Sequence, residues 1–344
     1  MTSSLTLALA ALGGVVLAGV VAHGAWAARK AGPKRAAPSL QRDEPREPVM
    51  TNDPAEPTPA ASFEPRSVAR ASARLDALID AIAPLTLDAP ISGELVLMHL
   101  PPTRRAGSKP FMIEGLNADS GEWETALPGQ RYGEFQAGVQ LANRTGALNE
   151  IEYSEFVQTI EAFAEGIGAM ADFPDMLDVV ARARELDTFA GEHDAQLAVH
   201  LQARSAAWSV GYIQQHAARH GFVPGAVPGR LVLPASEDGA PPVLTLSFDS
   251  QAALADDPNR AAVRDVTLSF DVPQTDPQVD PFIAWQASAQ ALALGMDAGI
   301  VDDNGRALSP EGFAAIGSEL GELYRTLESH DLAAGSAAAR RLFS

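Results

Sequence analysis

Residues 195–202 read AQLAVHLQ, a short run in which apolar and polar side chains alternate. The apolar members, which share one side of an extended chain, are Leu197, Val199 and Leu201. The members on the opposite side are Gln196, Ala198 and His200. A period of two residues is typical of a β-strand with one face against a core. We therefore predict a strand at 196–202, and this strand organises the last third of the chain, from Asp194 to Ser329.

Further strands and helices follow this run. The alternating segments that predict strands are 230–233, 243–248 and 266–272. Apolar residues at helical spacing predict one helix at 206–220, one around Phe282, Trp285, Ala289 and Leu292, and one around Phe313, Ile316, Leu320, Leu323 and Leu327. Between the last two helices, Asn304–Gly305 favours a tight turn. Ser309 and Pro310 then suit the cap and the first position of the closing helix.

This order predicts an α+β domain at 194–330, an antiparallel sheet with helices on one face. A flexible C-terminal tail, 331–344, is expected to follow it.

The middle segment, 67–193, has a similar pattern and is expected to form an α+β middle lobe. We predict strands at 94–100, 110–117, 122–124 and 133–143, and helices at 75–82, at 153–166 and from Pro174. The order of features is the same as in the last third. A strand is followed by a helix that starts with an aromatic residue, then by a short connection that contains Met, and then by a closing helix that starts at Pro and ends in His-Asp. Internal duplication into two lobes and convergent patterning both explain this likeness. A duplicated first copy would lack the helix that follows the first strand of the second copy.

The N-terminal run 5–28 contains no Asp, Glu, Lys or Arg and is long enough to cross a bilayer as a helix. The residues expected at the membrane flank are Trp26, Arg29, Lys30, Lys34 and Arg35. Because the basic residues follow the run, the positive-inside rule predicts that residues 1–4 lie outside and the bulk of the chain lies in the cytoplasm. A cleaved signal peptide is the alternative, since Ala25–Ala27 has the small-x-small pattern of a cleavage site. Signal peptides carry their basic residues before the apolar run, which favours an anchor here.

Residues 29–66 combine this basic flank with a Pro-rich segment. Seven prolines lie between 36 and 65, among Glu, Asp, Thr and Ala. Such a composition cannot bury enough apolar surface to offset the entropy of ordering. We predict a disordered spacer with polyproline II character.

Composition and motifs exclude several classes of function. Lys+Arg 25 against Asp+Glu 44 gives a net charge of -19, which opposes binding to nucleic acid. The chain has no Cys, so it has no thiolate metal site or thiol nucleophile. The sequence contains no phosphate loop, nucleophile elbow or zinc protease motif. His216 and His220 have the spacing of zinc ligands without a third ligand nearby, and Asp302–Asn304 suits a turn better than a calcium loop. We predict a protein that is not an enzyme, with no cofactor, metal or small-molecule substrate.

Four phrases together resemble the ZipA family of cell-division proteins. They are HGFVPG (220–225), PPVLTLSF (241–248), VTLSFDVP (266–273) and DPFIAWQASAQALALGMDAGIVDDNGRALSPE (280–311). The layout of an apolar N-terminal run, a Pro-rich spacer and a C-terminal α+β domain is also similar. The resemblance covers about 194–328, and the segment 90–190 lies outside the usual family pattern.

The resemblance implies a split β-α-β fold whose open sheet face takes the C-terminal peptide of FtsZ, a tubulin-like protein. Carried over by residue, the partner-binding positions are Gln196, Ala198, His200, Val227, Phe248, Thr267 and Ser269. The family groove is aliphatic and aromatic, whereas most of these residues are polar. A groove moved to a seam with the middle lobe, or a weakened groove, therefore remains open.

The function that the resemblance implies is an adaptor in the bacterial inner membrane. The run 5–28 would sit in the lipid bilayer with the N-terminus in the periplasm, and the C-terminal domain would anchor the FtsZ ring. One alternative is a membrane-anchored scaffold that binds another envelope or division protein through the middle lobe. A second alternative is an RNA-binding module, which the net charge and the lack of a basic aromatic face oppose.

Overall fold

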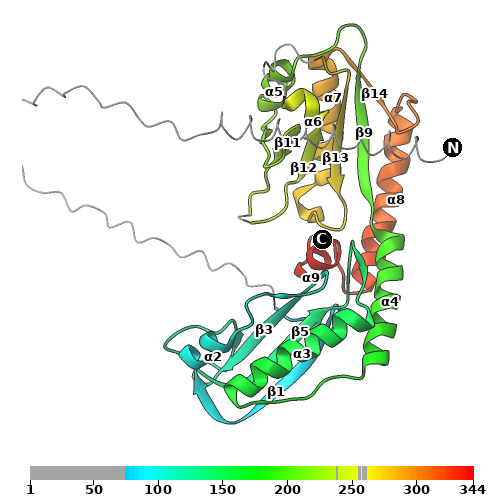
Figure 1. Ribbon diagram of the computed structural model, residues 1–344. Coiled ribbons are helices and arrows are strands. Elements are labelled where there is room, and N and C mark those ends of the chain that lie inside the picture. Colours follow the sequence, from blue (N-terminus) through cyan, green and yellow to red (C-terminus); the bar gives the residue numbers. More distant parts are fainter. Residues whose placement is uncertain (1–73, 238, 255–256, 258–261) are drawn as a thin grey trace, which may run out of the picture. The chain divides into compact units, whose positions relative to one another are not determined.

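The computed structural model describes residues 74–237, 239–254, 257 and 262–344, which are drawn in colour in Figure 1. The expected membrane run at 5–28 and the spacer at 29–66 lie outside these residues. Across the described ranges, no helix has both the length and the apolar character that a membrane span needs.

The middle lobe is built on a six-stranded antiparallel sheet with the order β2-β3-β5-β1-β8, in which β4 pairs with β3. Its strands are β1 (Asp80–Ser92), β2 (Arg105–Ala106), β3 (Lys109–Asn117), β4 (Trp123–Glu124), β5 (Arg131–Gln140) and β8 (Met170–Ala171). Its helices are α2 (Gly93–His99), α3 (Glu150–Ile167) and α4 (Met176–His193). A small hairpin of β6 (Ala142–Asn143) and β7 (Gly146–Ala147) precedes α3. The core lies between α3 and the sheet, where Phe156 meets Phe111 and Phe163 meets Phe135 edge to face.

The C-terminal lobe has a second six-stranded antiparallel sheet, with the order β10-β11-β12-β13-β9-β14. Its strands are β9 (Gln196–Ala203), β10 (Val223–Pro224), β11 (Arg230–Leu233), β12 (Leu244–Ser247), β13 (Asp265–Asp271) and β14 (Ala298–Val301). Its helices are α5 (Val210–Ala218), the short α6 (Ser250–Ala253), α7 (Pro281–Met296) and α8 (Pro310–Ser329), with a 3-10 turn at Pro277–Val279. Both sheets are antiparallel and combine with helices, so the α+β class is confirmed.

The same topology occurs twice. Each lobe has the order strand, helix, strand, strand, helix, strand, helix from β1 to α4 and from β9 to α8, when β2, β4, β6, β7, β10, β11, the short helix α6 and the 3-10 turn are set aside. The central strand orders, β3-β5-β1-β8 and β12-β13-β9-β14, also correspond. In this correspondence α2 matches α5, so the helix expected to be missing from the first copy is present.

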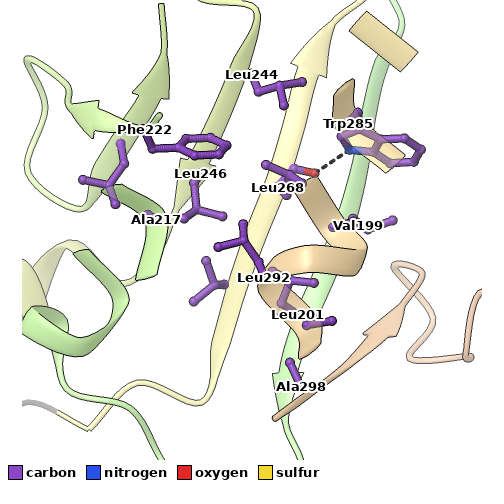
Figure 2. Packing of buried hydrophobic residues seen from close by; sticks show 14 of the residues in the cluster. Val199, Leu201, Ala217, Phe222, Leu244, Leu246, Leu268, Trp285, Leu292 and Ala298 are labelled. Atoms are coloured by element: carbon purple, nitrogen blue, oxygen red, sulfur yellow. Dashed lines mark hydrogen bonds between the residues drawn. The ribbon is translucent and has the colours of Figure 1, made fainter. Parts of the chain in front are cut away.

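Trp285 of α7 belongs to the C-terminal core and lies at the right of Figure 2. Its side chain is fully buried, and its Nε1 donates a hydrogen bond to the carbonyl of Leu268 on β13 at 2.9 Å. Other labelled side chains of this core are Val199 and Leu201 of β9, Leu246 of β12, Leu292 of α7 and Ala217 of α5. This packing fixes which face of the sheet meets the helices and which face stays open.

Helix termini follow the chemistry of their caps. Asn149 accepts hydrogen bonds at the start of α3 and forms a capping box with Glu152. Gly168 ends the same helix with a φ of 71°, a conformation that suits glycine. Ser309 caps α8 with Pro310 in its first turn, as the sequence predicted.

Two predictions in the middle lobe were wrong. Segment 94–100 is not a strand: Ser92 caps the backbone N–H of Leu95 and starts α2. Segment 75–82 is not a helix, because β1 begins at Asp80 and continues through Pro84. Proline fits at position 84 because its carbonyl points toward the short edge strand β8, where it accepts the N–H of Asp172. The hydrogen bonds between β1 and β5 therefore do not need an N–H from Pro84.

Two further corrections concern helix ends. Pro174 is not the first residue of a helix, since Asp175 caps α4 and the helix starts at Met176. Residues 331–344 are not a flexible tail. They contain α9 (Ala337–Leu342), and Leu332, Leu342 and Phe343 are buried in a small core. That core includes Ile79 and Ala142 of the middle lobe and Leu327 of α8, so apolar burial fixes the segment.

Candidate peptide-binding face

The expected site lies on β9 and β13, which pair in antiparallel register. His200 is opposite Thr267, and Ala198 is opposite Ser269. Their chain neighbours Val199, Leu201 and Leu268 point into the core. Since side chains alternate along a strand, these four residues share the face turned away from the core. The structure therefore brings together the expected residues of the two central strands, and Gln196 joins them at the end of β9, opposite Asp271.

The neighbouring strands continue this open face with mostly polar side chains. Ser247 lies opposite Thr267, and Thr245 lies opposite Ser269. One strand further, Arg230 and Val232 continue the same two rows. A partner on this face would meet hydroxyl, imidazole and amide groups with few apolar side chains, so hydrogen bonds would contribute more than apolar burial.

His200 is held between two carboxylates. Its Nδ1 lies 3.0 Å from Oδ1 of Asp265, and its Nε2 lies 3.1 Å from Oδ1 of Asp303 in the turn after β14. The hydrogen bond with Asp265 is the main cause that raises the pKa of His200 above its ordinary value, and Asp303 adds to it, while partial burial opposes them. A protonated imidazole can donate to both acids at once, so it ties the turn at 302–305 to the sheet.

The Gln196 end of the face adjoins the middle lobe. Arg144, from the β6–β7 hairpin, lies 2.7 Å from Asp271 and 2.5 Å from Asp194. Both carboxylates raise the pKa of Arg144 above its ordinary value, with Asp194 the larger cause. This cluster closes one end of the face with charged groups that are already paired.

Two expected residues do not join the site. Phe248 packs against the core cluster, because it has the same parity along the chain as Leu244 and Leu246, so its placement on the open face was wrong. Val227 is exposed in the turn between β10 and β11. Three strand spacings separate β11 from β9, which is about 14 Å.

A second open face, on the middle-lobe sheet, was not predicted. Ile82, Gly138 and Met112 form one row across β1, β5 and β3. Pro84, Gln136 and Glu114 form the next row. This face is more apolar than the one on β9 and β13. The alternation of β1 was the signal for it, but the sequence LDALIDAI was interpreted as a helix.

Among the described residues, no group of three or more His, Asp or Glu side chains is arranged to hold a metal ion. The membrane-flank residues Trp26, Arg29, Lys30, Lys34 and Arg35 lie outside the part of the chain that the structure describes.

Comparison with known proteins adds no relative. No protein-family model matches the chain, and no curated protein matches it.

Proposed function

We propose that this protein is a membrane-tethered adaptor of bacterial cell division that binds the C-terminal peptide of FtsZ, as the ZipA family does. The run at 5–28 would hold it in the inner membrane with the N-terminus in the periplasm. The observation that carries the proposal is the antiparallel sheet of the C-terminal lobe. Helices pack on one face of this sheet, and the other face is open on β9 and β13.

The polar character of this face sets the expected strength of binding. Gln196 and Thr267 supply hydrogen-bonding groups and little apolar area, whereas Ser269 is buried and both ring nitrogens of His200 already lie against carboxylates. A single contact with a peptide is therefore weak. Tethering at a membrane raises the effective concentration of a weak site, and many FtsZ tails on one filament add avidity. A weak face is therefore compatible with recruitment of a polymer.

A titration of the full-length chain in detergent micelles with a fluorescent FtsZ tail peptide tests the proposal. We expect saturable binding that weakens about threefold to tenfold in Thr267→Val, because a hydrogen bond contributes about 1 kcal/mol. The matched control is Thr326→Val, which removes an exposed hydroxyl on α8 whose only described acceptor is the carbonyl of Glu322. Absence of binding at high micromolar peptide overturns the FtsZ proposal.

A second candidate is a membrane-anchored scaffold that binds another division or envelope protein through the middle lobe. The apolar row of Ile82 and Met112 favours it. Met112→Glu places a charge on that row, and its effect distinguishes the FtsZ proposal from the scaffold proposal. FtsZ tail binding should persist in this variant under the first proposal, and recruitment to the division site should fail under the second.

A further inference from the structure

The open face of the middle-lobe sheet has a recess at its centre. Gly138, on the central strand β5, lies between Ile82 of β1 and Met112 of β3 in the same row. The recess is filled from outside the sheet by Leu75. A Cβ atom on Gly138 would lie 2.3 Å from Cδ2 of Leu75, closer than real Cβ contacts allow. The leucine therefore occupies space that only glycine leaves free at this position.

The backbone of the same segment is also bound. The N–H of Leu75 donates to Oε1 of Glu114 at 3.1 Å, and Oε2 of Glu114 accepts a hydrogen bond from Gln136 at 2.9 Å. Glu114 is only 4 % exposed, so its carboxylate depends on these two donors. On the other side, Nη1 of Arg341 donates to the carbonyl of Arg74 at 3.2 Å. One acceptor and one donor thus hold one peptide unit of an extended segment, and an aliphatic side chain fills the recess beside it.

This contact is separate from the hydrophobic cores. Leu75 is partly exposed and belongs to none of the buried clusters. Two open cavities are lined by this segment or by residues of the face it contacts. One of about 340 Å³ is lined by Met112 and Glu114, and one of about 270 Å³ is lined by Leu75, Ala337 and Arg341. The face consequently has room for a peptide longer than the part of the chain now seated on it.

We propose that this face is a peptide-binding site whose resident occupant is the chain's own Arg74–Asp76 segment. The matching partner is an extended peptide with one aliphatic anchor for the Gly138 recess, an N–H for Glu114 and a carbonyl for Arg341. Such a peptide competes with Leu75, so the segment limits access to the middle lobe. The proposal does not depend on FtsZ, because the groups that define it lie on the other sheet.

The experiment uses a fluorescent synthetic peptide with the sequence of residues 70–80 and the full-length chain. In the wild-type chain Leu75 already occupies the recess, and we expect little binding of the peptide. Leu75→Ala empties the recess and should raise the affinity at least about tenfold, as expected when an intramolecular competitor is removed. Adding Gly138→Val to Leu75→Ala fills the recess again and should abolish that gain. Leu294→Ala, a change at an exposed leucine on α7, should behave as the wild type.

Cleavage by trypsin after Arg74 gives a second measurement within the intact chain. Gly138→Ala places a Cβ atom against the end of the Leu75 side chain, which must then shift and loses its place in the recess. Cleavage after Arg74 should therefore become faster relative to cleavage after the exposed Arg325, with wild-type protein as reference. Equal peptide binding by wild type and Leu75→Ala, or unchanged cleavage in Gly138→Ala, overturns the proposal. If Leu75→Ala does not fold, the cleavage measurement still decides.

Discussion

Arg341 of α9 and Asp80 at the start of β1 form a buried ion pair, although 261 positions separate them in the chain. Nη1 of Arg341 lies 2.8 Å from Oδ2 of Asp80, whose side chain is fully buried. The backbone N–H of Asp76 donates to the same carboxylate at 2.9 Å. The pair therefore joins the C-terminal segment to the first strand of the middle lobe.

The effects of removing the two partners should not be additive. Arg341→Met leaves the Asp80 carboxylate buried without its cation, and we expect a loss of about 3 kcal/mol in the free energy of unfolding. The double variant with Asp80→Asn should lose less than the sum of the two single variants, because no uncompensated charge remains. Denaturant titration of the four proteins measures this coupling. Glu322→Gln, which breaks the exposed pair with Arg325, is the control and should cost less than about 1 kcal/mol. Strict additivity at Asp80 and Arg341 would contradict the assignment.

His200 should make stability depend on pH with a definite sign. The pKa of His200 is raised in the folded state, mainly by Asp265. The contribution of His200 to the free energy of unfolding is therefore complete below the unfolded pKa of about 6.5, and it is lost as the pH rises through the folded pKa. The difference in unfolding free energy between wild type and His200→Gln should therefore be larger at acid pH than at alkaline pH. Equilibrium unfolding across this range measures it. His220→Gln, at an exposed position, serves as the control, and an equal difference at both pH values for His200→Gln would contradict the geometry.

Trp285 should be sensitive to a change that keeps its aromatic character. Trp285→Phe removes the hydrogen bond to the buried carbonyl of Leu268 and leaves a gap, which together should cost about 2–3 kcal/mol. Ile283→Ala on the same helix changes a side chain that is 63 % exposed, and it should cost less than about 1 kcal/mol. Thermal unfolding followed by circular dichroism compares the two. A smaller loss for Trp285→Phe than for Ile283→Ala would mean that Trp285 does not belong to the core.

Two glycines at helix ends should respond to alanine in opposite directions. Gly168 has a φ of 71° with no atom within 4 Å of an added Cβ, so Gly168→Ala should cost about 1 kcal/mol through backbone strain alone. Gly191 lies within α4 and is equally unobstructed, so Gly191→Ala should stabilise by about 0.5–1 kcal/mol. Urea titration of both variants tests the pair. A stabilised Gly168→Ala protein would exclude the left-handed cap.

The sequence predicted best those elements whose pattern had one interpretation. The alternation in AQLAVHLQ and VTLSFD predicted β9 and β13, and it put His200 and Thr267 on the same face. Their position opposite each other is a finding of the structure. In contrast, LDALIDAI fits both a helix and the start of a strand, and a distant interaction with β5 decides between them. Phe248 was misplaced because its side was assigned from the resemblance, whereas the strand parity set by Leu244 and Leu246 places it with the core. The recess at Gly138 could not be predicted, since it joins residues from three strands and a segment before β1.

The C-terminal segment also affects the order in which the protein folds during synthesis. Each sheet is made of residues that are contiguous in the chain, so each lobe can assemble its strands soon after they leave the ribosome. The small core of Ile79, Ala142, Leu327 and Leu342 cannot, because its members come from both ends of the described chain. The nascent middle lobe therefore exposes Ile79 and an unpaired Asp80 until residues 332–343 emerge. A chaperone that recognises exposed apolar surface has its longest opportunity to bind during this interval.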